Sequence, residues 1–253
     1  MMHTTKNKNL TQDLVERIGK LIVKGDVAAG QNLPIEAKLC EMFDSSRTVL
    51  REAIKMLTAK GLVGSMPKRG TYVEPEKNWN FLDPDVLEWI LQRRFSPTLL
   101  KEFLIVRQSI EPTAAVQAIS NASPEQIEAI RIALLHMEDA ANGDYDPLEA
   151  DIAFHIKILD ASCNRFIQQF APVVKTALNF SIRMTNQEKG VRIADVSAHA
   201  EIYYAIRDKK PSKARKIVYD LLQEAIELTE AVEAKYKLKT ATNESISRPP
   251  QPL

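Results

Sequence analysis

The stretch FDSSRTVLREAIKMLTAKGLV, from Phe43 to Val63, has two patterns at helical spacing. One face of the helix it predicts carries a cation at every fourth residue, at Arg47, Arg51 and Lys55. Another face is apolar, at Leu50, Ile54 and Leu57. A helix that packs on one side and presents three cations on the other is suited to binding a polyanion such as DNA.

The charge of the whole chain is divided unevenly around this stretch. Up to residue 73 there are 12 Lys and Arg against 7 Asp and Glu, which gives +5. The rest has 22 against 26, which gives −4, so the formal net charge is +1. A small basic head on a mildly acidic body indicates a polyanion-binding module joined to a second domain.

Length and composition fit a soluble protein of about two domains. Of the 253 residues, 45% are hydrophobic and 26% are charged, which is enough to form a real core. No apolar run approaches the roughly 18 residues that span a bilayer, and the first residues do not resemble a secretion signal. Cys40 and Cys163 lie far apart, as expected for reduced thiols. We therefore expect a cytoplasmic protein without membrane association.

Around the opening stretch, the sequence predicts three helices and a β-hairpin. The first helix covers about residues 11–23, and a short second helix follows Pro34. Ser45 or Ser46 can cap the third helix, because a serine hydroxyl can accept a hydrogen bond from a free amide at a helix start. Strands at 62–65 and 71–73 then flank a turn at 67–70. Three helices followed by a hairpin form a winged helix-turn-helix.

The remainder predicts helices only, so the fold class is mainly α: a winged helix-turn-helix followed by an all-helical bundle. Proline, glycine and asparagine mark the expected breaks near residues 96–97, 122–124, 143–147, 163–164, 190 and 210–211. We expect a DNA-binding domain at residues 8–75, a linker at 76–84, an effector-binding and dimerisation domain at 85–238, and a disordered tail at 239–253.

The third helix is the expected DNA reader. The N-terminal part of such a helix reaches base edges in the major groove, and arginine can offer two parallel donors to guanine. Lys68 and Arg69 lie on the hairpin turn, where they could contact a phosphate or a neighbouring groove. The alternative is a charged face that is simply solvated, which is common for an isolated helix.

The segment AGQNLPIEAKLCEMFDSSRTVLREAIKMLTAKGLVGSMPKRGTYVEP closely resembles the DNA-binding domain of the GntR family of bacterial transcription regulators. The family elements PG-x-x-LP-SE, V-SR-x-x-VREAL and GRG-x-FV are present here as AGQNLPIE, SSRTVLREAI and KRGTYV. Ala37 departs from relatives that place an arginine there. The resemblance implies DNA contacts at Glu36, Ser46, Arg47, Thr48, Arg51, Lys68, Arg69 and Gly70. One recognition helix per chain favours a homodimer on palindromic operator DNA.

The body contains a possible metal site. Asp151 and His155 lie one helical turn apart in EADIAFHIKIL, and His199 follows in VSAHAEIYYAI. Two ligand-type side chains at this spacing can chelate a divalent ion. The alternative is that these are polar residues of the core with their own hydrogen-bond partners, which is more common for a histidine on an apolar helix face.

From about Asp83 to Leu228 the body resembles the ligand-binding domain of the FadR-like branch of that family, the FCD domain. The resemblance implies that Asp151, His155 and His199 bind a divalent metal, with zinc as our first expectation. The last histidine of the family pattern is replaced by Leu221, and Asp220 beside it would point elsewhere, so the site offers three protein ligands and open positions.

The same resemblance indicates where an effector would bind. It implies that Arg107 faces the cavity and grips a carboxylate, whereas its spacing alone favours an ion pair with Glu111. Arg183 and Asn186, with Thr185 between them, are further candidates. The tryptophan-bracketed segment from Trp79 to Trp89 resembles regulators of the sugar-acid (galactonate-type) operons, and we expect its aromatic rings to attach the linker to the body.

We therefore predict a ligand-responsive, DNA-binding transcription regulator that represses a sugar-acid catabolic operon and is not an enzyme. The alternative is a metal-dependent hydrolase, because three protein ligands and an open position are also a catalytic pattern. The sequence has no HExxH motif, no nucleophile elbow and no evident general base beside His155. A hydrolysis assay with and without chelator would distinguish the two.

Overall fold

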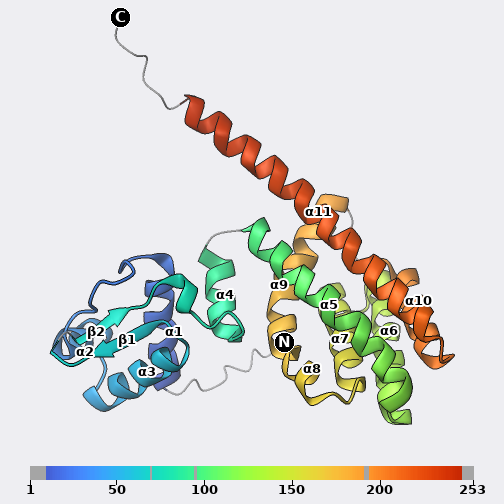
Figure 1. Ribbon diagram of the computed structural model, residues 1–253, viewed down its shortest axis with the longest axis horizontal. Helices are drawn as coiled ribbons and strands as arrows, with labels where there is room; N and C mark the ends of the chain where they lie inside the picture. The colour runs from blue at the N-terminus through green and yellow to red at the C-terminus, as the bar shows by residue number, and fades with distance from the viewer. Residues whose placement is uncertain (1–9, 69, 94–95, 191–193, 247–253) are drawn as a thin grey trace, which may run out of the picture. The chain divides into compact units, whose positions relative to one another are not determined.

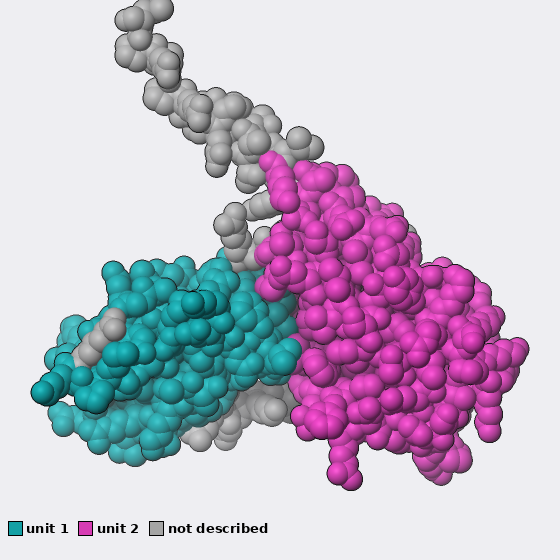
Figure 2. All heavy atoms as spheres, in the orientation of Figure 1, with its two compact units in different colours: residues 1–95 teal, residues 96–253 magenta. Residues whose placement is uncertain are grey.

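The computed structural model describes residues 10–68, 70–93, 96–190 and 194–246 (Figure 1). The chain divides into two compact units, with the boundary between residues 95 and 96 (Figure 2). Apart from one short hairpin and a single isolated bridge, the regular structure of the described residues is helical. The predicted fold class is confirmed. No helix in the described part of the chain is both long enough and apolar enough to cross a bilayer.

The first unit contains the winged helix-turn-helix. Its elements are α1 (Leu10–Lys24), α2 (Glu36–Phe43), α3 (Arg47–Ala59), β1 (Val63–Met66) and β2 (Gly70–Val73). The two strands pair antiparallel, from Val63 opposite Val73 to Met66 opposite Gly70. The hairpin is the wing, and α3 lies within the stretch from Phe43 to Val63 that carries the three cations.

The third helix forms for the reasons that its sequence indicates. Ser46, rather than Ser45, is the N-cap, and its hydroxyl accepts a hydrogen bond from the Val49 amide. The apolar face of α3 packs against α1. Its buried residues are Leu50, Ala53 and Leu57. Gly61, which follows the helix, has a φ of 76°, a left-handed conformation that favours glycine.

The expected linker is part of the first unit. Residues 76–78 form the short 3-10 helix η1 (Glu76–Asn78), and α4 (Pro84–Arg93) packs against α1. Lys60, just after α3, is nearly buried, and its Nζ lies 2.7 Å from Asp83 and 2.8 Å from Asp85. These contacts move the boundary from the expected residue 85 to residue 96, because α4 has its apolar partners in α1.

The two tryptophans also belong to the first unit, so the expectation that they attach the linker to the body is wrong. The Trp89 ring packs directly against Gly19 of α1, which has no side chain to obstruct it. The Trp79 indole donates a hydrogen bond to the carbonyl of Glu74, at 2.9 Å. Both rings are buried within the first unit.

The second unit is a helical bundle. Its helices are α5 (Pro97–Asn121), α6 (Pro124–Asn142), α7 (Pro147–Ala161), α8 (Arg165–Gln169), α9 (Ala171–Lys189), α10 (Val196–Arg207) and α11 (Pro211–Ile246). Helices α5 and α11 lie side by side, and α7 packs against α5, α6 and α9 (Figure 1). The core includes Leu104, Phe154, Leu178 and Ile202, all fully buried.

Helix α11 is longer than expected. It continues to Ile246, so residues 239–246, which we expected to be disordered, are helical. Extending an existing helix costs far less than starting one, so a polar stretch without glycine or proline can continue it. Residues 247–253 lie outside the described part of the chain.

Candidate functional site

The expected DNA-contacting residues of the first unit lie around the start of α3. Arg47, Thr48 and Arg51 are exposed on α3, and the Ser46 hydroxyl caps it. Glu36 comes from the first turn of α2, and its Oε2 lies 3.2 Å from Nε of Arg51. The structure therefore brings five of the eight predicted residues into one neighbourhood.

The wing presents two of the others. Lys68 is exposed in the turn after β1 with a φ of 65°, and Gly70 begins β2 with a φ of 90°. Both conformations are left-handed, which is easy for Gly70 and uncommon for a lysine. Arg69 lies outside the described residues.

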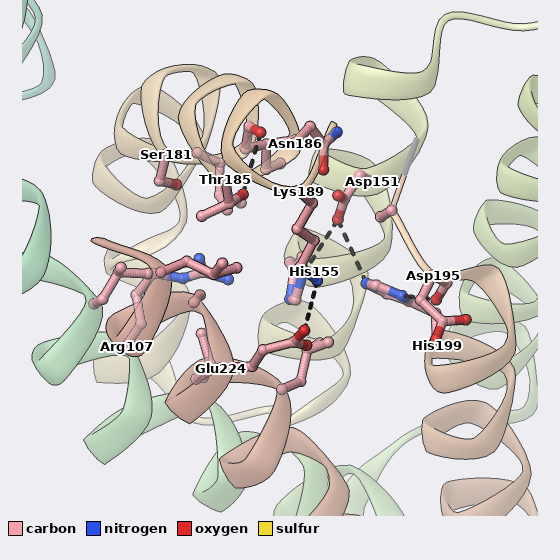
Figure 3. Close-up of a pocket in the computed structure, with 18 residues that line it drawn as sticks. Arg107, Asp151, His155, Ser181, Thr185, Asn186, Lys189, Asp195, His199 and Glu224 are labelled. Atoms are coloured by element: carbon pink, nitrogen blue, oxygen red, sulfur yellow. Dashed lines mark hydrogen bonds and ion pairs between the residues drawn. The ribbon is translucent and has the colours of Figure 1, made fainter. Parts of the chain in front are cut away.

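The three predicted metal ligands of the second unit meet in one buried cluster. Asp151 and His155 lie one turn apart on α7, and His199 comes from α10. One ligand atom from each residue lies within 4.8 Å of the others. The Oδ1 atom of Asp151 is 3.3 Å from Nε2 of His155 and 3.5 Å from Nε2 of His199 (Figure 3). The spacing of residues in the sequence predicted that Asp151 and His155 are neighbours, but it did not predict that α10 would bring His199 to them.

Nε2 of each histidine faces Asp151, and Nδ1 of each contacts an outer partner that holds the ring in place. Nδ1 of His199 lies 2.7 Å from the backbone carbonyl of Asp195, and a carbonyl can only accept, so this nitrogen carries a proton. Nδ1 of His155 lies 3.0 Å from Oε2 of Glu111 on α5. Such outer contacts fix the ring orientation of metal-binding histidines in proteins.

Two atoms at the centre of the cluster lack a hydrogen-bond donor. Among the described residues, Oδ1 of Asp151 and Nε2 of His199 are buried and have no hydrogen-bond partner. With His199 protonated on Nδ1, both atoms are acceptors that point toward each other. Buried polar atoms are nearly always satisfied, so a cation between them is the simplest way to complete the site. The residues present therefore fit a divalent metal.

Neighbouring charges shift the ionisation of the cluster. Burial alone would raise the pKa of Glu111, but Arg107 and His155 outweigh it and lower that pKa to about 2. Burial would likewise raise the pKa of Asp151, whereas the two histidines hold it below its usual range. For His155 burial lowers the pKa, but the Glu111 charge and the Asp151 carboxylate, whose Oδ1 lies 3.3 Å from Nε2, raise that pKa. Both carboxylates are therefore charged at neutral pH.

A cavity of about 70 Å³ adjoins the cluster. Arg107 of α5 lines it and is only 4% exposed. Its guanidinium also bonds Glu111, with N–O distances of 2.5 and 3.1 Å, so the ion pair and the cavity-facing position are both present. Leu221 lines the cavity where the family pattern has a histidine.

The structure separates the remaining effector candidates. Thr185 and Asn186 line the cavity. Arg183 does not belong to the described residues around it; its side chain is exposed and borders a separate surface hollow near Asp146. On α9, residue 183 lies roughly 100° around the helix from residue 182 and roughly 160° from residue 185, so its side chain falls outside the face that carries residues 181, 185 and 189 along the cavity.

Several polar lining residues were not predicted from the sequence, among them Ser181, Lys189, Asp195 and Glu224. Lys189 of α9 and Glu224 of α11 border the cavity and form an ion pair with a 2.9 Å Nζ–Oε1 distance (Figure 3). A signal for Lys189 was available, because Ser181, Thr185 and Lys189 recur at every fourth position. Glu224 had none, because exposed glutamates are frequent on long helices.

A winged helix-turn-helix and a helical domain with a polar cavity together define a ligand-responsive, DNA-binding transcription regulator. Residues 10–73 match the family model for bacterial regulatory proteins of the gntR family, and residues 102–224 match the FCD domain. The chain belongs to the GntR family, in the FadR-like branch that carries an FCD domain. These families are regulators, and nothing here supports the hydrolase alternative.

Named relatives agree with this assignment. The chain is 37% identical over 169 residues to the galactonate operon transcriptional repressor of Escherichia coli K12. The matched region covers 66% of this chain and 73% of that protein. It is also 37% identical over 166 residues to the uncharacterized regulator YieP of the same organism, covering 65% and 72%. A solved structure described as Lar, which controls the Listeria monocytogenes agr system, has a TM-score of 0.58 at 18% identity. That match covers 90% of this chain and 99% of the other, and it supports the fold alone.

Proposed function

We propose that the protein is a dimeric repressor of a sugar-acid catabolic operon and that its effector releases it from DNA. The observation that carries this proposal is the buried cluster of Asp151, His155 and His199, whose unsatisfied acceptor atoms adjoin a cavity lined by Arg107. The similarity to a galactonate operon repressor supports a sugar acid as the effector class.

In this proposal the cluster holds one divalent metal. Two imidazole nitrogens and one carboxylate form a ligand set that zinc commonly takes, so zinc is the first candidate. Leu221 provides no ligand atom, which leaves coordination positions for water or for ligand oxygens. When bound, the metal supplies a Lewis acid for a carboxylate oxygen and a neighbouring hydroxyl.

Arg107 is the proposed carboxylate anchor. A guanidinium has five N–H donors, and Glu111 takes the one on Nε and one on a terminal nitrogen. The remaining donors are available to an acid in the cavity. Because Glu111 also contacts His155, the anchor and the metal cluster are held by the same carboxylate.

The DNA-binding surface is proposed to be the start of α3 together with the wing. One recognition helix per chain fits a two-fold dimer on a palindromic operator, with each α3 in the major groove of one half-site. Glu36 would orient Arg51 through their ion pair, while Arg47 and Thr48 are exposed on the same surface. The protein would act on chromosomal DNA in the cytoplasm.

The proposed effector acts by shifting an equilibrium between states that bind the operator well and poorly. It can do so only by its difference in affinity for the two states, and a tenfold difference corresponds to about 1.4 kcal/mol per bound site. The test is to titrate hexonates, uronates, simple hydroxy acids and acyl thioesters into a preformed operator complex with metal present. Release by a sugar acid is expected. Release by an acyl thioester or an amino acid, without any response to sugar acids, would contradict the proposal.

A further inference from the structure

The cavity has an inner end and an outer end of different character. Arg107, Asp151 and His155 at the inner end are buried. Lys189 and Glu224 lie at the outer end, where their side chains are 30% and 54% exposed. Figure 3 shows the Lys189 side chain extending from α9 toward Glu224 on α11. The outer end therefore carries one cation and one anion that bond each other.

A row of polar groups on α9 leads along the cavity to this pair. Ser181, Thr185 and Lys189 follow at every fourth residue, and all three line the cavity. The Thr185 hydroxyl donates to the carbonyl of Ile182 at 3.2 Å, so its lone pairs remain available as acceptors. Hydroxyls spaced along a helix face are suited to hydrogen-bonding a chain of ligand hydroxyls.

We propose that Lys189 and Glu224 recognise the end of the effector farthest from its anchored carboxylate, and that they select a hydroxyl there over a second carboxylate. The inference rests on the proposed function, which places a sugar acid in this cavity. It adds a specificity rule: aldonates, which end in a hydroxyl, are preferred to the corresponding aldarates, which are diacids.

The chemistry of the pair gives the reason. A hydroxyl both donates and accepts, so it can accept a hydrogen bond from Lys189 and donate one to Glu224. A second carboxylate can accept from Lys189, but it also meets the negative charge of Glu224, and like charges at close range disfavour binding. An apolar end would separate the two ions without giving either a new partner.

The ion pair can exchange its partners at little cost. Lys189 and Glu224 join α9 to α11 at the exposed end of the cavity, and such part-exposed ion pairs contribute little to stability. Each side chain can therefore give up its bond to the other for a bond to a ligand hydroxyl.

The experiment measures binding of matched acids by titration calorimetry to the full chain loaded with zinc. The pairs are galactonate with galactarate and gluconate with glucarate, which differ only at the far end. Wild-type protein should bind at least one aldonate at least tenfold more tightly than its aldarate. Glu224→Gln should reduce that ratio at least fivefold, because the amide keeps the size and removes the charge. Lys189→Met should weaken binding of both members of the pair.

Two matched controls carry the same substitutions on the same helices. Glu227→Gln changes an exposed residue of α11 that Gln223 contacts, and Lys175→Met changes an exposed residue of α9. Neither residue lines the cavity in the described part of the chain, so neither control should alter the ratio. Circular dichroism spectra verify that every variant is folded before binding is measured.

The possible outcomes separate this inference from the function on which it rests. If wild-type protein binds an aldonate but Glu224→Gln leaves the ratio unchanged, the specificity rule is overturned and the sugar-acid proposal stands. If wild-type protein prefers the aldarate, the rule is also overturned. If none of the four acids binds to zinc-loaded protein, both the rule and the sugar-acid proposal are overturned.

Discussion

The ring of Trp89 occupies the space in which a side chain on Gly19 would lie. A β-carbon built on Gly19 would come within 2.2 Å of the ring, far closer than any real contact. This relationship fixes α4 on α1 and so makes residues 84–93 part of the DNA-binding unit. The carbonyl of Val23, at the end of α1, also accepts a hydrogen bond from Arg93 at 2.7 Å.

Substituting Gly19 by alanine tests this packing. The new methyl group would displace Trp89, and overpacking of this kind destabilises proteins by about 1–3 kcal/mol. Alanine is the better helix former by about 1 kcal/mol, so the two effects have opposite signs. We expect net destabilisation, measured by urea unfolding with tryptophan fluorescence. In a Trp89→Leu background the same change should cost less or become favourable, and a stabilised single Gly19→Ala variant would refute the packing argument.

Removal of Arg47 or Arg51 tests the recognition helix. Each alanine variant should lose about 1–3 kcal/mol of operator affinity if the arginine makes a bidentate base contact. Folding should change little, because both side chains are exposed. Fluorescence anisotropy with a mapped operator measures the loss, with Arg165→Ala on α8 as an exposed control in the other unit. Unchanged operator affinity in both variants would show that α3 is not the reader.

The wing lysine should contribute through phosphate. Lys68→Ala is expected to weaken binding to specific and unrelated DNA by similar factors and to reduce the slope of log affinity against log salt by about one. Affinity measured over a range of salt concentrations gives this slope. A loss confined to the specific site would assign Lys68 to base reading instead.

Metal binding should release a proton and should strengthen as pH rises. The pKa of His155 is raised in the metal-free protein, so near and below that pKa the ring holds a proton that a metal must displace. Affinity therefore increases with pH until His155 is neutral. Titration calorimetry in two buffers with different ionisation heats detects the proton. Elemental analysis should give about one ion per chain, lost in His155→Ala and His199→Ala, and full loading of the double variant would refute the site.

Arg107→Lys tests the carboxylate anchor with the charge retained. Lysine cannot reproduce the planar fork of arginine, and hydrogen bonds to charged groups contribute about 1.5–3 kcal/mol each. We expect effector affinity to fall by that order. Thermal unfolding without effector should be measured in parallel, because Arg107 also neutralises the buried Glu111. Arg183→Lys, which lies outside the lining residues described here, should bind effector normally; an equal loss there would remove the distinction between the two arginines.

Much of this molecule followed from the sequence alone. The cation stripe and apolar face of α3, its serine cap and the wing turn are local patterns, and local hydrogen bonding and side-chain spacing decide them. The helix breaks of the second unit were predictable for the same reason, because proline and glycine act within a few residues. Asp151 and His155 share one turn, so their proximity was also a local property.

Only the tertiary structure decided which distant residues meet. That His199 reaches Asp151, that Glu111 connects Arg107 to His155, and that Lys189 bonds Glu224 depends on how helices pack, and packing depends on whole faces rather than on neighbours in sequence. The position of Trp89 also depends on helix packing. From its place in the sequence we expected it to attach the linker to the second unit. Gly19 lies 70 residues earlier in the chain. Because it has no side chain, the Trp89 ring has room to pack directly against α1.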